Sequence, residues 1–226
     1  MTADPLADMG KATAIIVAAG CSSRMGFDKI FAEILGKPVL LYSLEAFQAA
    51  KMIDEIIVVN ENNDKINSFA HHIPKLSGIV KGGKNRAESV RNGLNAIRSQ
   101  QGIVAIHDGA RPLITPDLID KIVNEATLHK AAIPAVPVRD TIKKVKDDCV
   151  ESTPNRETLC AAQTPQCFDL ALYRKAMSHQ QAVTDDSMGV EQIGVKVKIV
   201  PGDCANIKIT TPEDLKIARA LLSGTD

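Results

Sequence analysis

The stretch AIIVAAGCSSRMGFDKIF, residues 14–31, begins as an unbroken apolar run and then changes to small residues with one arginine and one lysine. Such a run is typical of a strand that is covered on both faces of a parallel sheet. The segment after it is either a plain turn or a loop whose backbone N–H groups and cations, Arg24 and Lys29, close around phosphates. The spacing G-x-x-x-R is a weak signal alone, so the rest of the chain decides between these two interpretations.

Strand-like and helical patterns alternate along most of the chain. Pro116 suits the first turn of a helix that Thr115 would cap, and the last helix is expected to begin at Thr211. The alternation indicates a single α/β domain with a mostly parallel, Rossmann-like sheet and helices on both faces. Strands are predicted at 13–19, 55–60, 78–83, 102–108, 131–138 and 195–200, and helices at 38–50, 85–99, 115–130, 169–178 and 184–193.

Residues 139–160, here called the arm, interrupt this alternation. Ile142, Val145 and Val150 are separated by charged residues, and no long helix fits the segment. The pattern predicts two strands that leave the core. A two-stranded ribbon is only marginally stable alone, so we expect the arm to pack on another surface, for which a second subunit is the candidate.

The composition is that of an ordinary globular protein, with 226 residues, 45% hydrophobic and 24% charged. The 27 acidic and 27 basic residues balance, which argues against a broad nucleic-acid or membrane surface but not against a local basic pocket. The 5 cysteines show no zinc-type spacing and predict a reduced, cytoplasmic chain. Residues 1–11 do not resemble a signal peptide, and we expect them to be disordered.

Several chemically distinctive groups follow predicted strands, where ligands bind in open parallel sheets. Gly82 and Gly83, with Ser89 in the next helix, either allow a flat ligand to approach the backbone or make a plain turn. Asp108 ends an apolar strand, where a carboxylate needs a partner. That partner is either a metal ion that carries phosphate oxygens or the nearby Arg111.

Two later segments carry further candidates. Asp185, in TDDSMGVE (184–191), either reaches the same metal or belongs to an ordinary helix start capped by Thr184. Lys208, in NIKITTPEDL (206–215), either meets a phosphate or is a surface lysine. Two cations and a carboxylate at strand ends suit attack on a nucleotide α-phosphate, which needs mainly positioning and charge neutralisation. The sequence lacks the G-x-G-x-x-G and P-loop patterns, which disfavours hydride transfer and a P-loop enzyme.

Seven blocks in order carry a resemblance that runs from about Ala14 to Leu222. They are AAGCSSRMG, GGKNRAESV, HDGARP, VPVRDTIK, QTPQCF, TDDSMGVE and NIKITTPEDL. The chain resembles the 2-C-methyl-D-erythritol 4-phosphate cytidylyltransferases of the non-mevalonate isoprenoid pathway. The resemblance implies a homodimeric enzyme that uses Mg²⁺, CTP and 2-C-methyl-D-erythritol 4-phosphate. Its products would be 4-diphosphocytidyl-2-C-methyl-D-erythritol and pyrophosphate.

The resemblance also implies residue roles. The catalytic cations are Arg24, Lys29 and Lys208, and Asp108 helps to hold Mg²⁺. Nucleotide binding is assigned to Ala18, Ala19, Gly20, Gly82, Gly83, Ser89, Asp108 and Ala110. Binding of the second substrate is assigned to Arg111, Thr141, Arg156, Thr164, Thr184, Asp185 and Lys208, with Arg156 donated across the dimer interface by the arm.

The first loop departs from the family pattern. Ser22 stands where a glycine is usual, and the segment between Arg24 and Lys29 is two residues shorter. Asp28 and Ile30 flank the lysine in place of a proline and a glutamine. Cys21 in the same loop is interpreted as a small filler. Two alternatives stay open: a ribitol-5-phosphate cytidylyltransferase, which shares most of the blocks, and a catalytically inactive nucleotide-binding subunit, which the shortened loop suggests.

Overall fold

The computed structural model describes residues 11–20, 28–178 and 184–224. Arg24, Cys21 and Ser22 lie outside the described residues, as do residues 1–10 of the segment expected to be disordered. Lys11, the last residue of that segment, is described, and its carbonyl accepts a hydrogen bond of 3.3 Å from the Ile103 amide. Within the described ranges, no helix is both long and apolar enough to cross a membrane.

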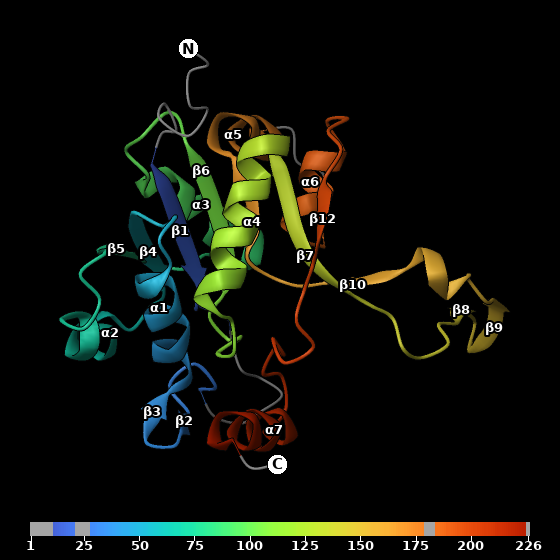
Figure 1. The fold of residues 1–226 in the computed structure, drawn as a ribbon, viewed down its shortest axis with the longest axis horizontal. Coiled ribbons are helices and arrows are strands. Elements are labelled where there is room, and N and C mark those ends of the chain that lie inside the picture. The colour runs from blue at the N-terminus through green and yellow to red at the C-terminus, as the bar shows by residue number, and fades with distance from the viewer. Residues whose placement is uncertain (1–10, 21–27, 179–183, 225–226) are drawn as a thin grey trace.

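Eight strands of the described chain form one central sheet (Figure 1). Its order is β10-β7-β11-β6-β1-β4-β5, with β12 beside β7. The strands are β1 (Ala12–Val17), β4 (Glu55–Val59), β5 (Leu76–Val80), β6 (Ile103–Asp108), β7 (Ala131–Pro137), β10 (Cys160–Ala162), β11 (Gln166–Asp169) and β12 (Lys198–Pro201).

The sheet is mostly parallel, as predicted, and two antiparallel strands were not predicted. β1 pairs in parallel with β4 and β6, and β12 pairs in parallel with β7. β11 lies antiparallel between β6 and β7, and β10 lies antiparallel beside β7. The QTPQCF block therefore returns the chain into the sheet after the arm.

Helices cover both faces because alternate residues of the buried strands point to opposite sides. Ile16 of β1 packs in one apolar cluster with residues of α1 and α4, whereas Ile15 packs in a second cluster with residues of α3 and α5. Thr115 caps α4 as predicted, with Pro116 at its start. The helices are α1 (Val39–Ala49), α2 (Asn63–Ala70), α3 (Arg86–Ala96), α4 (Pro116–His129), α5 (Leu170–Ser178), α6 (Asp186–Glu191) and α7 (Pro212–Ser223).

The strand order changes direction at β1. The chain leaves β1 through α1 and reaches β4 on one side, while β6 lies on the other side. Ligands bind at such a switch point in open α/β sheets, because the segments that follow adjacent strands turn to opposite faces and leave a crevice. The fold therefore places a crevice at the carboxyl ends of β1, β4 and β6.

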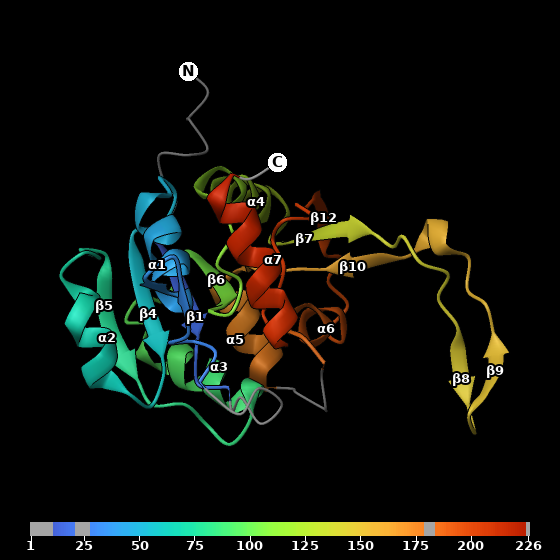
Figure 2. The ribbon, with the colours of Figure 1, turned by 90° about the horizontal axis from the view of Figure 1, so that it is seen from below.

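The arm projects from the body beyond the ends of β7 and β10 (Figures 1 and 2). Within it, β8 (Lys144–Lys146) and β9 (Cys149–Ser152) pair antiparallel, and a 3-10 turn follows at Arg156–Thr158. Val145 is 61% exposed and Val150 is 62% exposed. A smaller hairpin, β2 (Glu33–Ile34) and β3 (Lys37–Pro38), lies beside α7.

Candidate active site

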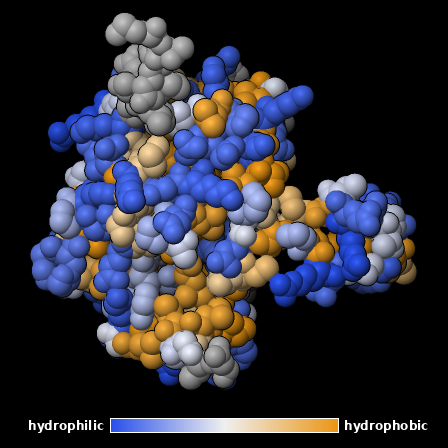
Figure 3. Space-filling view, viewed as in Figure 1, coloured by the Kyte–Doolittle hydropathy of each residue, from blue (hydrophilic) through white to orange (hydrophobic). Residues whose placement is uncertain are grey.

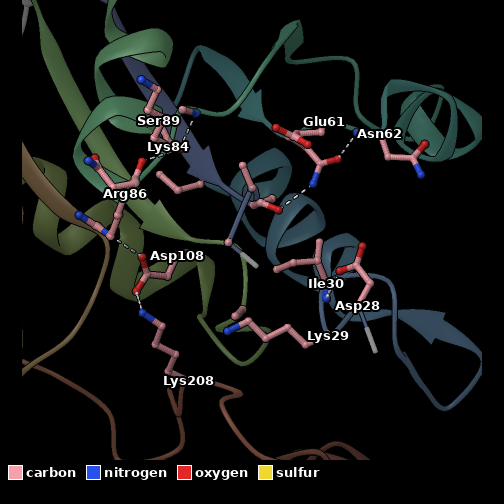
Figure 4. Close-up of a pocket in the computed structure, with 18 residues that line it drawn as sticks. Asp28, Lys29, Ile30, Glu61, Asn62, Lys84, Arg86, Ser89, Asp108 and Lys208 are labelled. Carbon is pink, nitrogen blue, oxygen red and sulfur yellow. Dashed lines mark hydrogen bonds and ion pairs between the residues drawn. The ribbon is translucent and has the colours of Figure 1, made fainter. Parts of the chain in front are cut away.

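An open cavity of about 870 Å³ lies where the fold predicts it, at the carboxyl ends of β1, β4, β5 and β6 (Figure 4). It combines backbone from the strand ends with polar side chains from the following loops and helices. Its lining residues are Val17, Ala18, Ala19, Gly20, Asp28, Lys29, Ile30, Asn60, Glu61, Asn62, Gly83, Lys84, Asn85, Arg86, Ser89, Asp108, Ala110 and Lys208.

Asp108 forms the centre of a charged cluster on one side of this cavity. The Lys208 Nζ lies 2.7 Å from Asp108 Oδ2, and the Arg86 Nε lies 3.1 Å from Asp108 Oδ1. Burial raises the pKa of the Asp108 carboxyl, but Arg86 and Lys208 outweigh that effect and lower the pKa below its usual range. Asp108 is therefore an ionised carboxylate with a cation at each oxygen.

Arg86, in the first turn of α3, is a site residue that the sequence interpretation missed. Its Nη2 also lies 2.7 Å from Oδ2 of the buried Asp186. Burial lowers the pKa of the guanidinium, but the carboxylates of Asp186 and Asp108 outweigh that effect and raise the pKa above its usual value, so Arg86 stays charged. Arg111, one of the two partners considered for Asp108, instead donates from Nη1 to the Asn206 carbonyl at 2.7 Å, and the ion pairs of Asp108 are with Arg86 and Lys208.

Thr164 and His107 support Asp108 from behind. The Asp108 amide donates to Thr164 Oγ1 at 3.1 Å, and Thr164 Oγ1 lies 3.1 Å from His107 Nδ1. His107 Nε2 lies 3.3 Å from the Arg111 carbonyl, which can only accept, so the ring proton belongs on Nε2 and Thr164 donates to Nδ1. Burial lowers the pKa of His107 to about 3, so the ring is neutral. Thr164, expected to contact substrate, is here a buried support for Asp108.

Of the tandem glycines, Gly83 lines the cavity, and the small size of both glycines is required by packing. A Cβ on Gly82 would lie 2.3 Å from Ala19 Cβ, and a Cβ on Gly83 would lie 2.5 Å from Glu88 Cβ. Ser89 Oγ accepts from the Gly83 amide at 3.0 Å and donates to the Asn85 carbonyl at 2.9 Å. The loop backbone is therefore held directly against β1, as a narrow slot for a flat group requires.

Lys29 lies across the cavity from the glycine loop, with its side chain directed toward the Asp108 side (Figure 4). Glu61 and Asn62, which follow β4, form the far wall with Asp28. The buried Asn60 holds this wall, since its Nδ2 donates to the Ala18 carbonyl at 2.7 Å and its Oδ1 accepts from the Asn62 amide at 2.6 Å.

The structure brings together one part of the predicted site and leaves another part outside the cavity. Nine of the expected residues line the cavity: Ala18, Ala19, Gly20, Lys29, Gly83, Ser89, Asp108, Ala110 and Lys208. Gly82, Arg111, Thr141, Arg156, Thr164, Thr184 and Asp185 do not line it. Thr141 and Arg156 lie on the arm and are exposed.

The start of α6 differs from the expectation. Asp185 is the residue that caps this helix, with its Oδ1 accepting from the Met188 amide at 3.0 Å, so Thr184 is not the cap. Asp185 Oδ2 also accepts from Gln166 Nε2 at 2.9 Å. These contacts give Asp185 partners within the protein and do not direct it to Asp108.

A divalent cation fits this site only as part of a nucleotide complex. Among the described residues, no group of three or more Asp, Glu, His or Cys side chains is arranged to hold a metal. Asp108 supplies one carboxylate at a strand end, and Mg²⁺ is commonly held by one or two carboxylates plus substrate phosphates. The donor set therefore suits a cation whose other ligands are phosphate oxygens and water.

Comparisons with known proteins agree with the geometry. The family model described as 2-C-methyl-D-erythritol 4-phosphate cytidylyltransferase matches residues 12–224. A protein of that name from Caldanaerobacter subterraneus subsp. tengcongensis is 46% identical over 222 residues, covering 93% of this chain and 98% of the relative. Another from Rubrobacter xylanophilus is 43% identical over 226 residues, covering 96% and 97%.

Solved structures give the same result. The 4-diphosphocytidyl-2C-methyl-D-erythritol synthase from Anaerococcus prevotii superposes with a TM-score of 0.83 at 37% identity, covering 94% of this chain and 98% of that one. The 2-C-methyl-D-erythritol 4-phosphate cytidylyltransferase from Thermus thermophilus gives 0.77 at 30% identity, covering 95% and 100%.

Proposed function

The chain belongs to the family of 2-C-methyl-D-erythritol 4-phosphate cytidylyltransferases, and on this premise we propose how its own residues carry out the reaction. The enzyme transfers a cytidylyl group from CTP to 2-C-methyl-D-erythritol 4-phosphate in isoprenoid precursor synthesis. The phosphate oxygen of the acceptor attacks the α-phosphorus of CTP, and pyrophosphate leaves. A phosphate monoester is already largely ionised near pH 7, so no side chain has to remove a proton.

The protein contributes position and positive charge. Lys29 and Lys208 lie on the cavity wall where the α-phosphate and the attacking phosphate would meet, and Arg24 is proposed as the third cation. Positioned cations stabilise the charge that develops as the new bond forms. Mg²⁺ bound with CTP would supply further charge neutralisation, and Asp108 is the residue that would hold it.

The observation that carries this mechanism is the position of the Asp108, Lys208 and Arg86 cluster, which shares a cavity with the glycine loop. A pyrophosphate-release assay with CTP tests the function. We expect release with 2-C-methyl-D-erythritol 4-phosphate and much less with ribitol 5-phosphate. Release with ribitol 5-phosphate alone would contradict the proposed acceptor, and no release with either would contradict catalysis.

We propose that the glycine loop favours cytosine over uracil because two of its amide donors are already engaged. The Gly83 amide donates to Ser89 Oγ at 3.0 Å, and the Lys84 amide donates to Glu88 Oε2 at 2.9 Å. The loop therefore presents carbonyl acceptors to a base. Cytosine carries an amino donor where uracil carries a carbonyl oxygen. If uracil bound, its carbonyl oxygen would face a carbonyl of the loop, and both buried acceptors would lack a hydrogen-bond donor.

We expect kcat/KM for CTP to exceed that for UTP by about 10- to 100-fold. Replacing Ser89 with alanine frees the Gly83 amide as a donor, so Ser89→Ala should narrow the preference toward equality. Ser68→Ala is the matched control, because Ser68 also donates to a carbonyl of its own helix, α2, and does not line the cavity. Equal kcat/KM values for CTP and UTP in the unsubstituted enzyme would refute this interpretation of the loop.

We also propose that the enzyme is a homodimer in which each arm completes the partner's site. A second cavity, of about 730 Å³, lies at the base of the arm and includes Arg139, Arg156 and Ile199 in its lining. The arm exposes Ile142, Val145 and Val150, and both hydrophobic and hydrophilic surface is seen on it (Figure 3). Arg156 offers a planar guanidinium suited to a phosphate, but it does not line the active-site cavity of its own chain.

A further inference from the structure

A chain of five polar side chains runs from the cavity into the core between α5, α6 and the sheet. Beyond the ion pairs of Lys208 with Asp108 and of Asp108 with Arg86, the Arg86 Nη2 lies 2.7 Å from Asp186 Oδ2. The Tyr173 hydroxyl then donates to Asp186 Oδ1 at 2.7 Å. Asp186 is 4% exposed and Tyr173 is 1% exposed, so the inner end of this chain is shielded from water.

Tyr173 determines which way Asp186 faces. The tyrosine ring is stacked on Phe168, with ring centroids 5.0 Å apart and planes inclined by 13°, so its hydroxyl has a fixed position. With Oδ1 held by this hydroxyl, Asp186 presents only Oδ2 to Arg86. That contact is a charged pair at 2.7 Å in which one Asp186 oxygen takes part. The guanidinium is therefore divided between two carboxylates and is not held by both oxygens of either.

The division of Arg86 between two carboxylates matters because both oxygens of Asp108 are already paired with cations. Its Oδ1 faces Arg86 and its Oδ2 faces Lys208, whereas a metal ligand must direct one oxygen at the cation. Arg86 retains its ion pair with Asp186 when Asp108 turns to a metal, whereas the ion pair that the structure shows for Lys208 within the described residues is with Asp108 itself. Asp186 also balances the charge, because the cluster of two carboxylates and two cations is neutral with it and positive without it.

We propose that Asp186 and Tyr173 are positioning residues that set how Arg86 is divided between Asp186 and Asp108. Asp186 draws Arg86 from Asp108, so that Asp108 is able to bind the divalent cation carried by CTP, and Tyr173 limits this pull by holding Asp186 Oδ1. The proposal rests on the proposed role of Asp108 as the metal ligand. It assigns Tyr173 a part in metal-dependent nucleotide binding, although the residue touches neither ligand and lies behind the cavity wall.

Two nearly isosteric substitutions should shift this balance in opposite directions. In Asp186→Asn, Arg86 has Asp108 as its one carboxylate partner in the cluster, so Asp108 is less available to bind the metal ion. In Tyr173→Phe, the Asp186 carboxylate turns both oxygens to Arg86 and draws it away from Asp108, so Asp108 is more available. Damage to the fold alone would weaken CTP binding in both variants, so it would not produce effects of opposite sign in the two.

The measurement is the Kd of CTP by isothermal titration calorimetry, once with excess Mg²⁺ and once with a chelator, without the second substrate. The ratio of the two constants reports the coupling between metal and nucleotide. We expect Asp186→Asn to reduce the enhancement by Mg²⁺ about fivefold or more and to tighten metal-free CTP binding. We expect Tyr173→Phe to increase the enhancement about two- to fivefold.

The matched controls are Tyr42→Phe and Asp120→Asn. The Tyr42 hydroxyl donates to the Ile34 carbonyl, and Asp120 accepts from the Lys51 and Met52 amides, in both cases away from the cavity. Neither control should change the ratio. A shift of both test variants in the same direction, or none in either, would overturn the positioning role while leaving Asp108 as the metal ligand. Loss of Mg²⁺ enhancement in the unsubstituted enzyme itself would overturn both proposals.

Discussion

Replacement of Lys29 by alanine is expected to lower kcat about 10²- to 10³-fold and to change the Kd of CTP much less. Lys29 reaches the cavity from the segment after β1, and its side chain is directed toward the Asp108 side (Figure 4). A cation at this position meets the charge that develops on the phosphates during bond formation, so its removal affects the transition state more than the bound substrate. Steady-state kcat and calorimetric Kd values for CTP separate the two effects.

Lys37→Ala is the matched control for that experiment. Lys37 follows the same segment, but it lies in β3, its Nζ pairs with Oε2 of Glu45 in α1 at 2.6 Å, and it does not line the cavity. It should leave kcat nearly unchanged. A near-normal kcat for Lys29→Ala would show that the shortened loop does not deliver this lysine to the reaction, and Lys84, which does line the cavity, would be the next cation to replace.

The sheet and its helices were predictable because the local pattern and the tertiary structure agree. Ile15 and Ile16 of β1 are both fully buried on opposite faces, which is what an unbroken apolar run means in a parallel sheet. The antiparallel insertion of β11 was not predictable in the same way. Its four residues, Gln166–Asp169, carry no sign of strand direction, because direction follows from the return path of the arm and not from side-chain alternation.

Two of the expected site residues that line the cavity stand at or just after strand ends. Asp108 ends β6 and Gly83 follows β5, and both line the cavity because parallel strands deliver their ends to one edge. Arg86 was missed because an arginine in the first turn of a helix is usually solvated, and only the fold shows that the turn faces Asp108. Asp186 was missed for the same reason, since its partner Tyr173 belongs to a different helix.

Thr164 shows how a position in a motif can be right while its contact is different. Its hydroxyl lies beside Asp108, close to where the resemblance implies a substrate contact, but it is engaged by the Asp108 amide and by His107. Its single proton is donated to His107, so the hydroxyl cannot donate to a substrate as well. Sequence gives the neighbourhood of such a residue, whereas burial and hydrogen bonding determine what it touches.

Two inactive variants, Arg156→Ala and Lys208→Ala, are expected to recover about a quarter of the activity of the unsubstituted enzyme when they are unfolded together and refolded in equal amounts. Arg156 lies on the arm and does not line the active-site cavity of its own chain, whereas Lys208 lines that cavity beside Asp108. If the arm serves the partner's site, the first variant damages the donated half of a site and the second damages the receiving half.

The value of a quarter follows from the pairing. Half of the refolded dimers contain one chain of each kind, and each mixed dimer has one site with both defects and one site with neither. Because half of the dimers are mixed and each mixed dimer has one intact site out of two, about a quarter of all sites are intact. Refolding each variant alone is the control for recovery by refolding itself. Activity that stays at the level of the separate variants would show that Arg156 acts within its own subunit, because a site built from one chain carries the same single defect in a mixed dimer as in a homodimer.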